Sequence, residues 1–130
     1  MGVEGTRGCR DAGRFTWESG YDQALELLET DPVPTAVFCA SDVMALGAAR
    51  ACQDRGLRVP DDISFIGVDD IEVAAYQIPA LTTIRQSFAE LATLAVQLLL
   101  QIIEHGMPEH TQIVIEPELI KRDSTAPFTR

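Results

Sequence analysis

Polar side chains directly follow two short apolar runs of the sequence, at points where buried strands would end. Ser41 and Asp42 follow the first run, and Asp69 and Asp70 follow the second. In open parallel sheets, ligands bind outside the carboxyl ends of the strands, so we expect these groups to share one edge. Trp17 opens an amphipathic segment and can reach the same edge. A carboxylate, a hydroxyl and an indole suit a polyhydroxylated ligand; a purine or another small polar metabolite suits the same set.

Each of these residues also has a structural interpretation. Asp42 is most simply the N-cap of the helix that follows it. One of Asp69 and Asp70 can order its own loop by accepting hydrogen bonds from backbone amides. Trp17 can cover the core rather than contact a ligand.

The sequence favours neither catalysis nor metal binding. An Asp pair at a strand end could hold Mg²⁺ for phosphoryl transfer, but that chemistry also needs further acids at a neighbouring strand end and a lysine at the end of another. The only lysine is Lys121, near the C-terminus. His105 and His110 have no cysteine or carboxylate at metal-ligand spacing, and no nucleophile or phosphate-binding motif occurs. We therefore expect no enzyme activity, no metal and no cofactor.

Charge and composition exclude several classes of protein. The 130 residues are 46% hydrophobic with a formal net charge of −10, enough apolar residues for a core. Residues 59–120 contain ten acids and one base, Arg85. Without a basic stripe the chain cannot hold a nucleic acid or an anionic membrane surface. No apolar stretch approaches the roughly 20 residues of a spanning helix, so we expect no membrane contact.

Nothing marks the chain for export, and its cysteines indicate a reducing compartment. The first residues lack the apolar core of a signal peptide. Cys9, Cys39 and Cys52 are odd in number and lack C-x-x-C spacing. We expect buried, reduced thiols in a cytoplasmic protein.

The apolar periodicity predicts alternating helices and strands, which is typical of a doubly wound α/β protein with a parallel sheet. The predicted elements are a helix capped by Thr16, a strand at 35–40 buried on both faces, a helix opening at 41–42 and ending before Gly56, a strand at 63–68, a strand or crossover at 81–84, a helix at 87–105, and strand segments at 112–115 and 119–122.

The helix predicted at 87–105 has the clearest signals. Ser87 and Glu90 have the spacing of a capping box, and Gly106 and Pro108 stop the helix. Its apolar residues extend well beyond the usual stripe, so this helix must be covered on two sides.

Four sequence blocks resemble conserved blocks of one family. They are PTAVFCASDVMALGA at 34–48, GLRVPDDISFIGVDD at 56–70, PALTTIRQ at 79–86 and ELIKRDST at 118–125. In this order and spacing they resemble the lac/gal repressor family of bacterial transcriptional regulators. The resemblance implies a type I periplasmic-binding-protein-like fold, truncated to most of the C-terminal lobe of the sensor plus one helix and one strand of the N-terminal lobe.

The resemblance also implies a division of the chain. The expected parts are a poorly ordered start at 1–15, a partial effector-binding sensor at 16–126 and a tail at 127–130. Within the sensor, 16–82 would form the C-terminal lobe, 86–115 elements of the N-terminal lobe and 118–124 a return strand.

Carried over by position, the family's effector-binding residues match Trp17, Ser41 and Asp69. Ser41 is a departure, because many members have Asn there and a hydroxyl has one donor where an amide has two. Val68 also replaces a usual aromatic residue. The residues that resemble the family's dimerisation surface are Met44, Leu46, Gly47, Arg50, Tyr76, Gln77 and Ile78.

The resemblance thus implies the effector-binding and dimerisation portion of a transcriptional regulator. It would form a homodimer and sense a small metabolite, with a sugar the expected class, in the cleft between lobes. DNA would be bound only through an N-terminal headpiece that this chain lacks. The alternative is a periplasmic sugar-binding protein of an uptake system, which shares the fold.

Overall fold

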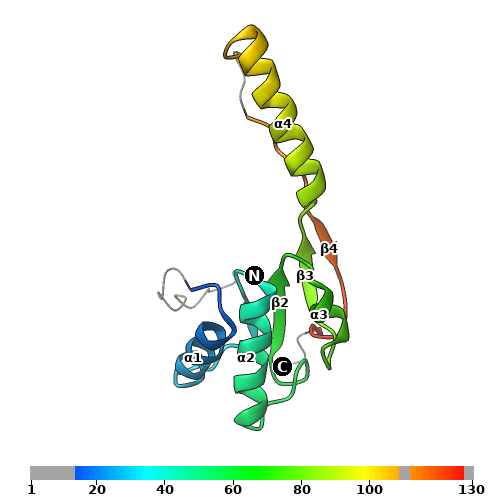
Figure 1. Cartoon of the computed structure of the whole chain (residues 1–130). Coiled ribbons are helices and arrows are strands. Elements are labelled where there is room, and N and C mark those ends of the chain that lie inside the picture. The colour runs from blue at the N-terminus through cyan, green and yellow to red at the C-terminus, as the bar shows by residue number, and fades with distance from the viewer. Residues whose placement is uncertain (1–13, 109–111, 128–130) are drawn as a thin grey trace.

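The computed structural model describes residues 14–108 and 112–127, which form an α/β body with a long helical arm (Figure 1). The elements are α1 (Trp17–Leu28), β1 (Ala36–Phe38), α2 (Asp42–Asp54), β2 (Ser64–Val68), α3 (Glu72–Tyr76), β3 (Thr82–Arg85), α4 (Phe88–His105) and β4 (Glu118–Ile120). Most of the expected start at 1–15 and of the tail at 127–130 lies outside the described residues.

The sheet has the order β1-β2-β3-β4. β1 pairs with β2 and β2 with β3 in parallel, whereas β4 runs antiparallel to β3, with Ile84 opposite Leu119. The predicted α/β class with a largely parallel sheet is therefore confirmed. The strand predicted at 112–115 is wrong: these residues have no regular structure, because no described strand lies beside them to complete a ladder.

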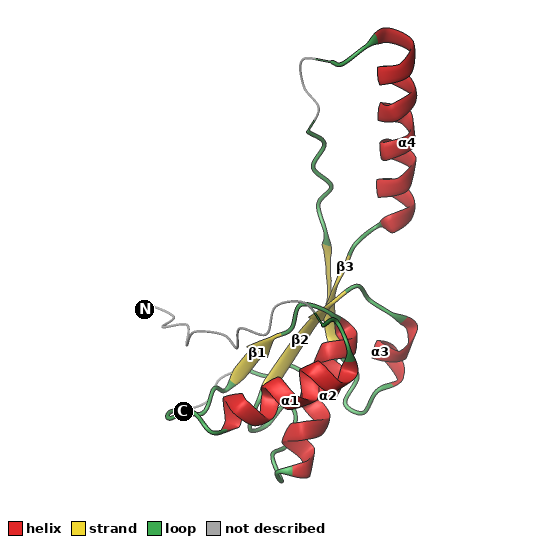
Figure 2. Ribbon diagram, turned by 60° about the vertical axis from the view of Figure 1, so that its left-hand side comes forward, coloured by secondary structure: helices red, strands yellow, loops and turns green. Residues whose placement is uncertain are grey.

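β1 differs from its prediction as a strand buried on both faces. Ala36 is exposed and the Phe38 side chain is 62% exposed. β1 is an edge strand, and α1 and α2 lie on the same side of the sheet (Figure 2). The core lies under these helices and includes Phe65, Ile63 and Leu81.

Two cysteines belong to this core. Cys39 and Cys52 are buried free thiols, as expected. Burial raises the pKa of Cys39 to about 12 and that of Cys52 to about 11, so both remain protonated at neutral pH. Cys9 lies outside the described residues.

α1 and α2 cross at two glycines. A Cβ added to Gly20 would lie 2.1 Å from the Met44 carbonyl oxygen, and one added to Gly47 would lie 2.1 Å from the Trp17 carbonyl oxygen. Only glycine permits backbones to approach this closely. Gly47 therefore lies buried against α1 of its own chain, and the prediction that it belongs to a dimer surface is wrong.

α4 begins without the predicted capping box. Ser87 occupies the N-cap position with ψ 81°, and its side chain makes no capping hydrogen bond. An N-cap hydroxyl reaches the first turn when its residue is extended, as Thr16 is at the start of α1 (ψ 159°). Ser87 is therefore the N-cap as predicted, but the capping box predicted for Ser87 and Glu90 is wrong.

α4 extends away from the body, joined to it through the β3–β4 pair (Figures 1 and 2). None of its residues is buried, and apolar side chains such as Ile103 are 70% exposed. The cover expected on two sides is therefore absent among the described residues. With 18 residues of mostly apolar composition, α4 is just long and apolar enough to cross a membrane, contrary to the expectation from sequence. One such helix is only weak evidence of a membrane span, because core helices of other proteins meet the same criteria.

We predict that Gly47→Ala destabilises the chain by about 3 kcal/mol or more, because the added methyl group overpacks a backbone contact that cannot yield locally. Urea unfolding followed by circular dichroism measures the change. Gly56→Ala is the control, because Gly56 has φ 79° but no atom within 4 Å of an added Cβ. It should cost only about 1 kcal/mol of backbone strain. Equal losses in both variants would contradict the crossing-contact explanation.

Candidate functional site

The loop that leaves β2 has an unusual backbone. Asp69 has φ 109° and Asp70 has φ 53°, positive values that non-glycine residues adopt at a cost in free energy. Such a conformation persists only where surrounding contacts impose it, so the contacts of this loop decide how Asp69 is presented.

Three consecutive backbone amides of the loop are held from neighbouring elements. The Asp69 amide donates to the Ile84 carbonyl at 2.9 Å. The Asp70 amide donates to Thr83 Oγ1 at 3.3 Å, and the Ile71 amide donates to Asp42 Oδ2 at 2.9 Å. β3 and the start of α2 together therefore fix the strained loop.

Asp42 is the centre of this arrangement and not a helix cap. Its carboxylate is fully buried and also accepts a 2.5 Å hydrogen bond from the Thr83 hydroxyl. Burial raises the pKa of Asp42 despite the opposing hydrogen bonds from Thr83 and Ile71. The N-cap of α2 is Ser41, whose hydroxyl accepts from the Met44 amide at 3.3 Å. The prediction that Asp42 caps this helix is wrong, because its side chain is directed to β3 instead.

Gly67 makes room for the Asp42 carboxylate. A Cβ at Gly67 would lie 2.2 Å from Asp42 Oδ1. Sequence reasoning missed the roles of both Gly67 and Thr83. The available signals were a glycine within an apolar strand and a hydroxyl at a strand position that should be apolar.

Ser41 and Asp69 follow the carboxyl ends of β1 and β2, whereas Trp17 begins α1; no hydrogen bond joins the three within the described ranges. Trp17 stacks on Tyr21 with ring centroids 5.3 Å apart and is 40% exposed. Ser41 is 5% exposed and occupied by its capping bond. Asp69 is half-buried, and burial raises its pKa. The structure therefore leaves Asp69 as the accessible acceptor of the three.

A hollow of about 320 Å³ lies between the end of the sheet and α4. Its wall from the body includes Val68, the residue before Asp69, and its wall from α4 includes Leu91. Volumes of about 300 to 1,000 Å³ are usual for small-molecule sites. Val68, smaller than the expected aromatic residue, thus borders this hollow, and Asp69 follows it in the chain.

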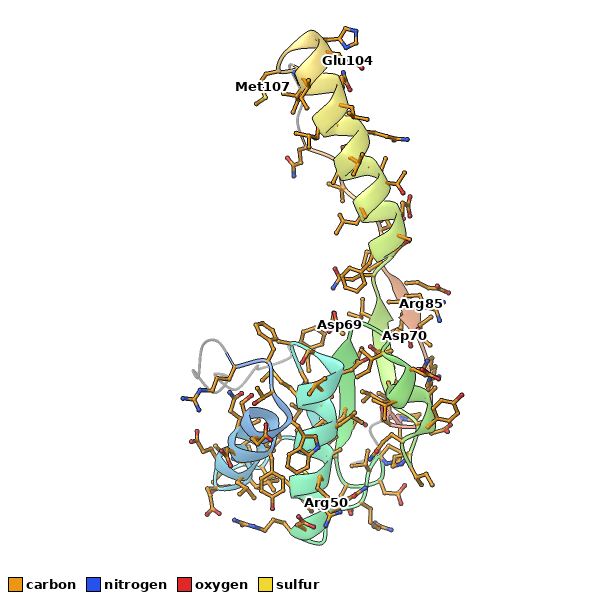
Figure 3. All side chains as sticks on the ribbon, viewed as in Figure 1. Arg50, Asp69, Asp70, Arg85, Glu104 and Met107 are labelled. Atoms are coloured by element: carbon orange, nitrogen blue, oxygen red, sulfur yellow. The ribbon has the colours of Figure 1, made fainter. Side chains whose placement is uncertain are left out.

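The residues expected at a dimer surface fall into two groups. Tyr76 and Ile78 are 75% and 85% exposed, and Arg50 is also exposed. Met44 and Leu46 are half-buried against the chain's own core. Gln77 is also half-buried. In Figure 3 Arg50 lies near the end of α2 that is remote from Asp69.

Comparison with known proteins decides the family. A family model described as a periplasmic binding protein-like domain matches residues 2–125. The chain belongs to this family. It is 48% identical over 115 residues to the HTH-type transcriptional repressor PurR of Haemophilus influenzae (strain PittEE), a match that covers 86% of the chain and 34% of that repressor.

Two solved structures of the same family show the same fold. The lac repressor dimer bound to operator and the anti-inducer ONPF superposes with a TM-score of 0.80 at 42% identity, covering 87% of this chain and 39% of that one. A LacI family regulator from Enterococcus faecium with bound ribose gives 0.76 at 35% identity, covering 89% and 42%. The resemblance to lac/gal regulators is confirmed. The chain spans about a third of the length of the curated relatives it matches.

We predict that Asp42→Ala lowers the free energy of unfolding by about 3 kcal/mol, because it leaves the Ile71 amide and the Thr83 hydroxyl without their buried acceptor. Thr83→Val should also destabilise the chain, and the double variant should cost less than the sum of the two. Urea unfolding of the parent, the two single variants and the double variant measures the coupling energy between Asp42 and Thr83. A coupling energy near zero would contradict the assigned hydrogen bond. Asp61→Ala, at an exposed ion pair with Arg58, is the control and should cost under about 1 kcal/mol.

Proposed function

We propose that this chain is the effector-binding and dimerisation portion of a cytoplasmic transcriptional regulator of the lac/gal type. Its ligand is a small polyhydroxylated metabolite, with a sugar as the first class to test. The observation that carries the proposal is the half-buried carboxylate of Asp69, unpaired among the described residues, at the end of β2. Asp69 is next in the chain to Val68, which lines the hollow between the sheet and α4. DNA binding belongs to a headpiece outside this chain.

The chemistry of Asp69 suits a sugar. An ionised carboxylate accepts hydrogen bonds from two hydroxyls, and such charge-assisted bonds are stronger than neutral ones. Burial raises the pKa of Asp69 because the carboxylate has lost part of its hydration. Hydroxyl donors of a ligand would replace the lost water and stabilise the ionised carboxylate. We propose the exposed face of Trp17 as a further contact, and the Ser41 hydroxyl as a donor only, because its oxygen already accepts from the Met44 amide.

The uptake-protein alternative is less well supported. A binding protein for uptake would share the fold, but the relatives reported above are transcriptional regulators. The ribose found in the Enterococcus faecium regulator supports a sugar as the ligand class.

We predict that D-ribose binds the isolated chain weakly, with a Kd in the millimolar range or about −4 kcal/mol. The affinity is low because this chain spans only about a third of the length of its relatives and supplies only part of a cleft between two lobes. Titration of the ¹⁵N-labelled chain should shift the amide signals of residues 69–71 first. Asp69→Asn should weaken binding at least tenfold, because a neutral amide replaces the charged acceptor.

Asp62→Asn is the matched control, because Asp62 is an acid that lies at the exposed Arg58 ion pair, and it should bind as the parent does. A parallel titration with hypoxanthine tests the purine class. Shifts confined to other residues, or ribose binding unaffected by Asp69→Asn, would contradict the proposed site.

We also propose a homodimer that uses the exposed side chains of Tyr76 and Ile78. Both extend from the segment that contains α3, and Val73 on α3 itself is 50% exposed. Contiguous exposed apolar side chains of this size mark interaction surfaces.

We predict that Ile78→Asp raises the dimer dissociation constant at least tenfold in sedimentation equilibrium, because a charge replaces an apolar contact. Leu99→Asp on α4 is the comparison, because Leu99 is 56% exposed on the arm. If Leu99→Asp alone abolishes association, the chain associates through α4 and the proposed surface is wrong.

A further inference from the structure

Asp70 is the junction of the body and the two strands that lead to the arm. Its Oδ2 accepts from Arg85 Nε at 2.7 Å, and its Oδ1 accepts from Arg122 Nη2 at 2.6 Å. Arg85 is the last residue of β3, and Arg122 lies two residues beyond the end of β4. One carboxylate thus contacts both chain segments that connect α4 to the body.

The contact continues across the strand pair. Arg85 also donates to Glu118 Oε2 at 3.1 Å, and Arg85 and Glu118 are opposite each other in the β3–β4 register. Arg122 donates in addition to the Leu81 carbonyl at 2.8 Å. Each guanidinium group therefore has a second acceptor besides Asp70, and the Asp70 carboxylate bridges the two arginines.

Low exposure distinguishes the Asp70–Arg122 pair of this cluster from ordinary surface ion pairs, although Arg85 is 48% exposed. Asp70 is 10% exposed and Arg122 is 18% exposed, whereas Arg58 and Asp62 are 69% and 34% exposed. Water screens an exposed pair and leaves it little net energy. Desolvation would raise the pKa of Asp70, but the hydrogen bonds from Arg122 and Arg85 outweigh it and hold the pKa below its usual range.

The orientation of α4 relative to the body depends on few contacts. α4 has no buried residue, and the part of the structure described here connects it to the body through β3 and β4. β3 is paired with β2 on its other side as far as Ile84, so the connection narrows to β3 and β4 alone only at Arg85 and Glu118. A two-stranded connection twists more readily than a wider sheet. A contact at the base of the ribbon therefore has a large effect on the orientation of the arm, and Figure 3 shows Asp70 and Arg85 at that base.

We propose that Asp70 is a positioning residue that sets the orientation of the β3–β4 ribbon and α4 relative to the body. It acts through Arg85 and Arg122 and is not itself a ligand contact. The neighbouring Asp69 amide is bonded to the Ile84 carbonyl, so the same ribbon also borders the strained loop. The consequence for effector sensing, a fixed opening between α4 and Asp69, rests on the proposed function; the positioning role does not.

The test is a distance measurement in the chain without ligand. Spin labels attached to keto amino acids at positions 53 and 101 report the separation of α2 and α4; both residues are exposed glutamines, and the labelling avoids the native cysteines. Double electron–electron resonance should give a narrow distance distribution in the parent. Asp70→Asn should at least double its width, because one of the two carboxylate oxygens becomes an NH2 group that cannot accept from a guanidinium, and the charge is lost.

Two further variants separate positioning from general stability. Asp70→Glu keeps the charge and both acceptors, so it should restore most of the narrow distribution. Asp62→Asn removes a carboxylate from an ion pair remote from the ribbon and should leave the width unchanged. If Asp70→Asn fails to fold by circular dichroism, Arg85→Gln, at a side chain 48% exposed, provides the same test.

The proposal is overturned if Asp70→Asn lowers the unfolding midpoint but leaves the distribution as narrow as in the parent. It is also overturned if Asp62→Asn broadens the distribution equally. A failure of ribose to bind affects the proposed function alone, because the distance measurement uses no ligand.

Discussion

The buried carboxylate of Asp42 is the interaction on which the candidate site depends. It connects the first residue of α2 to Thr83 in β3 and to the Ile71 amide in the loop after β2. These segments are far apart in sequence. Without Asp42, the Thr83 hydroxyl and the Ile71 amide would each lack a hydrogen-bond acceptor in a buried region, at a cost in free energy. The geometry of the loop, and therefore of Asp69, follows from this one buried group.

The glycines show why the carboxylate can occupy that place. Gly67 leaves the space that the Asp42 side chain fills, and Gly20 and Gly47 let α1 and α2 approach to backbone contact. α2 is therefore fixed on two sides, by α1 along its length and by β3 at its first turn. A helix fixed in this way can impose positive φ angles on the neighbouring loop, because the contacts outweigh the local strain.

Periodicity and turn residues predicted α1, α2, β2 and α4 within a few residues, because these elements are long or strongly patterned. Local pattern could not decide between Ser41 and Asp42 as the helix cap, since both types cap well. A hydroxyl 41 positions further along the chain decides it. The apolar run of β1 similarly predicted burial on both faces, which depends on what lies beside the strand and not on the strand itself.

The contrast between Asp69 and Asp70 explains how two adjacent identical residues take different roles. Asp70 faces the guanidinium groups of Arg85 and Arg122, and the pKa of its carboxyl lies below the usual range. Burial raises the pKa of the Asp69 carboxyl instead, with no cation paired to it among the described residues. Environments that separate the pKa values of neighbouring acids commonly separate their functions. The acceptor capacity of Asp70 is used within the chain, whereas that of Asp69 is left for a ligand.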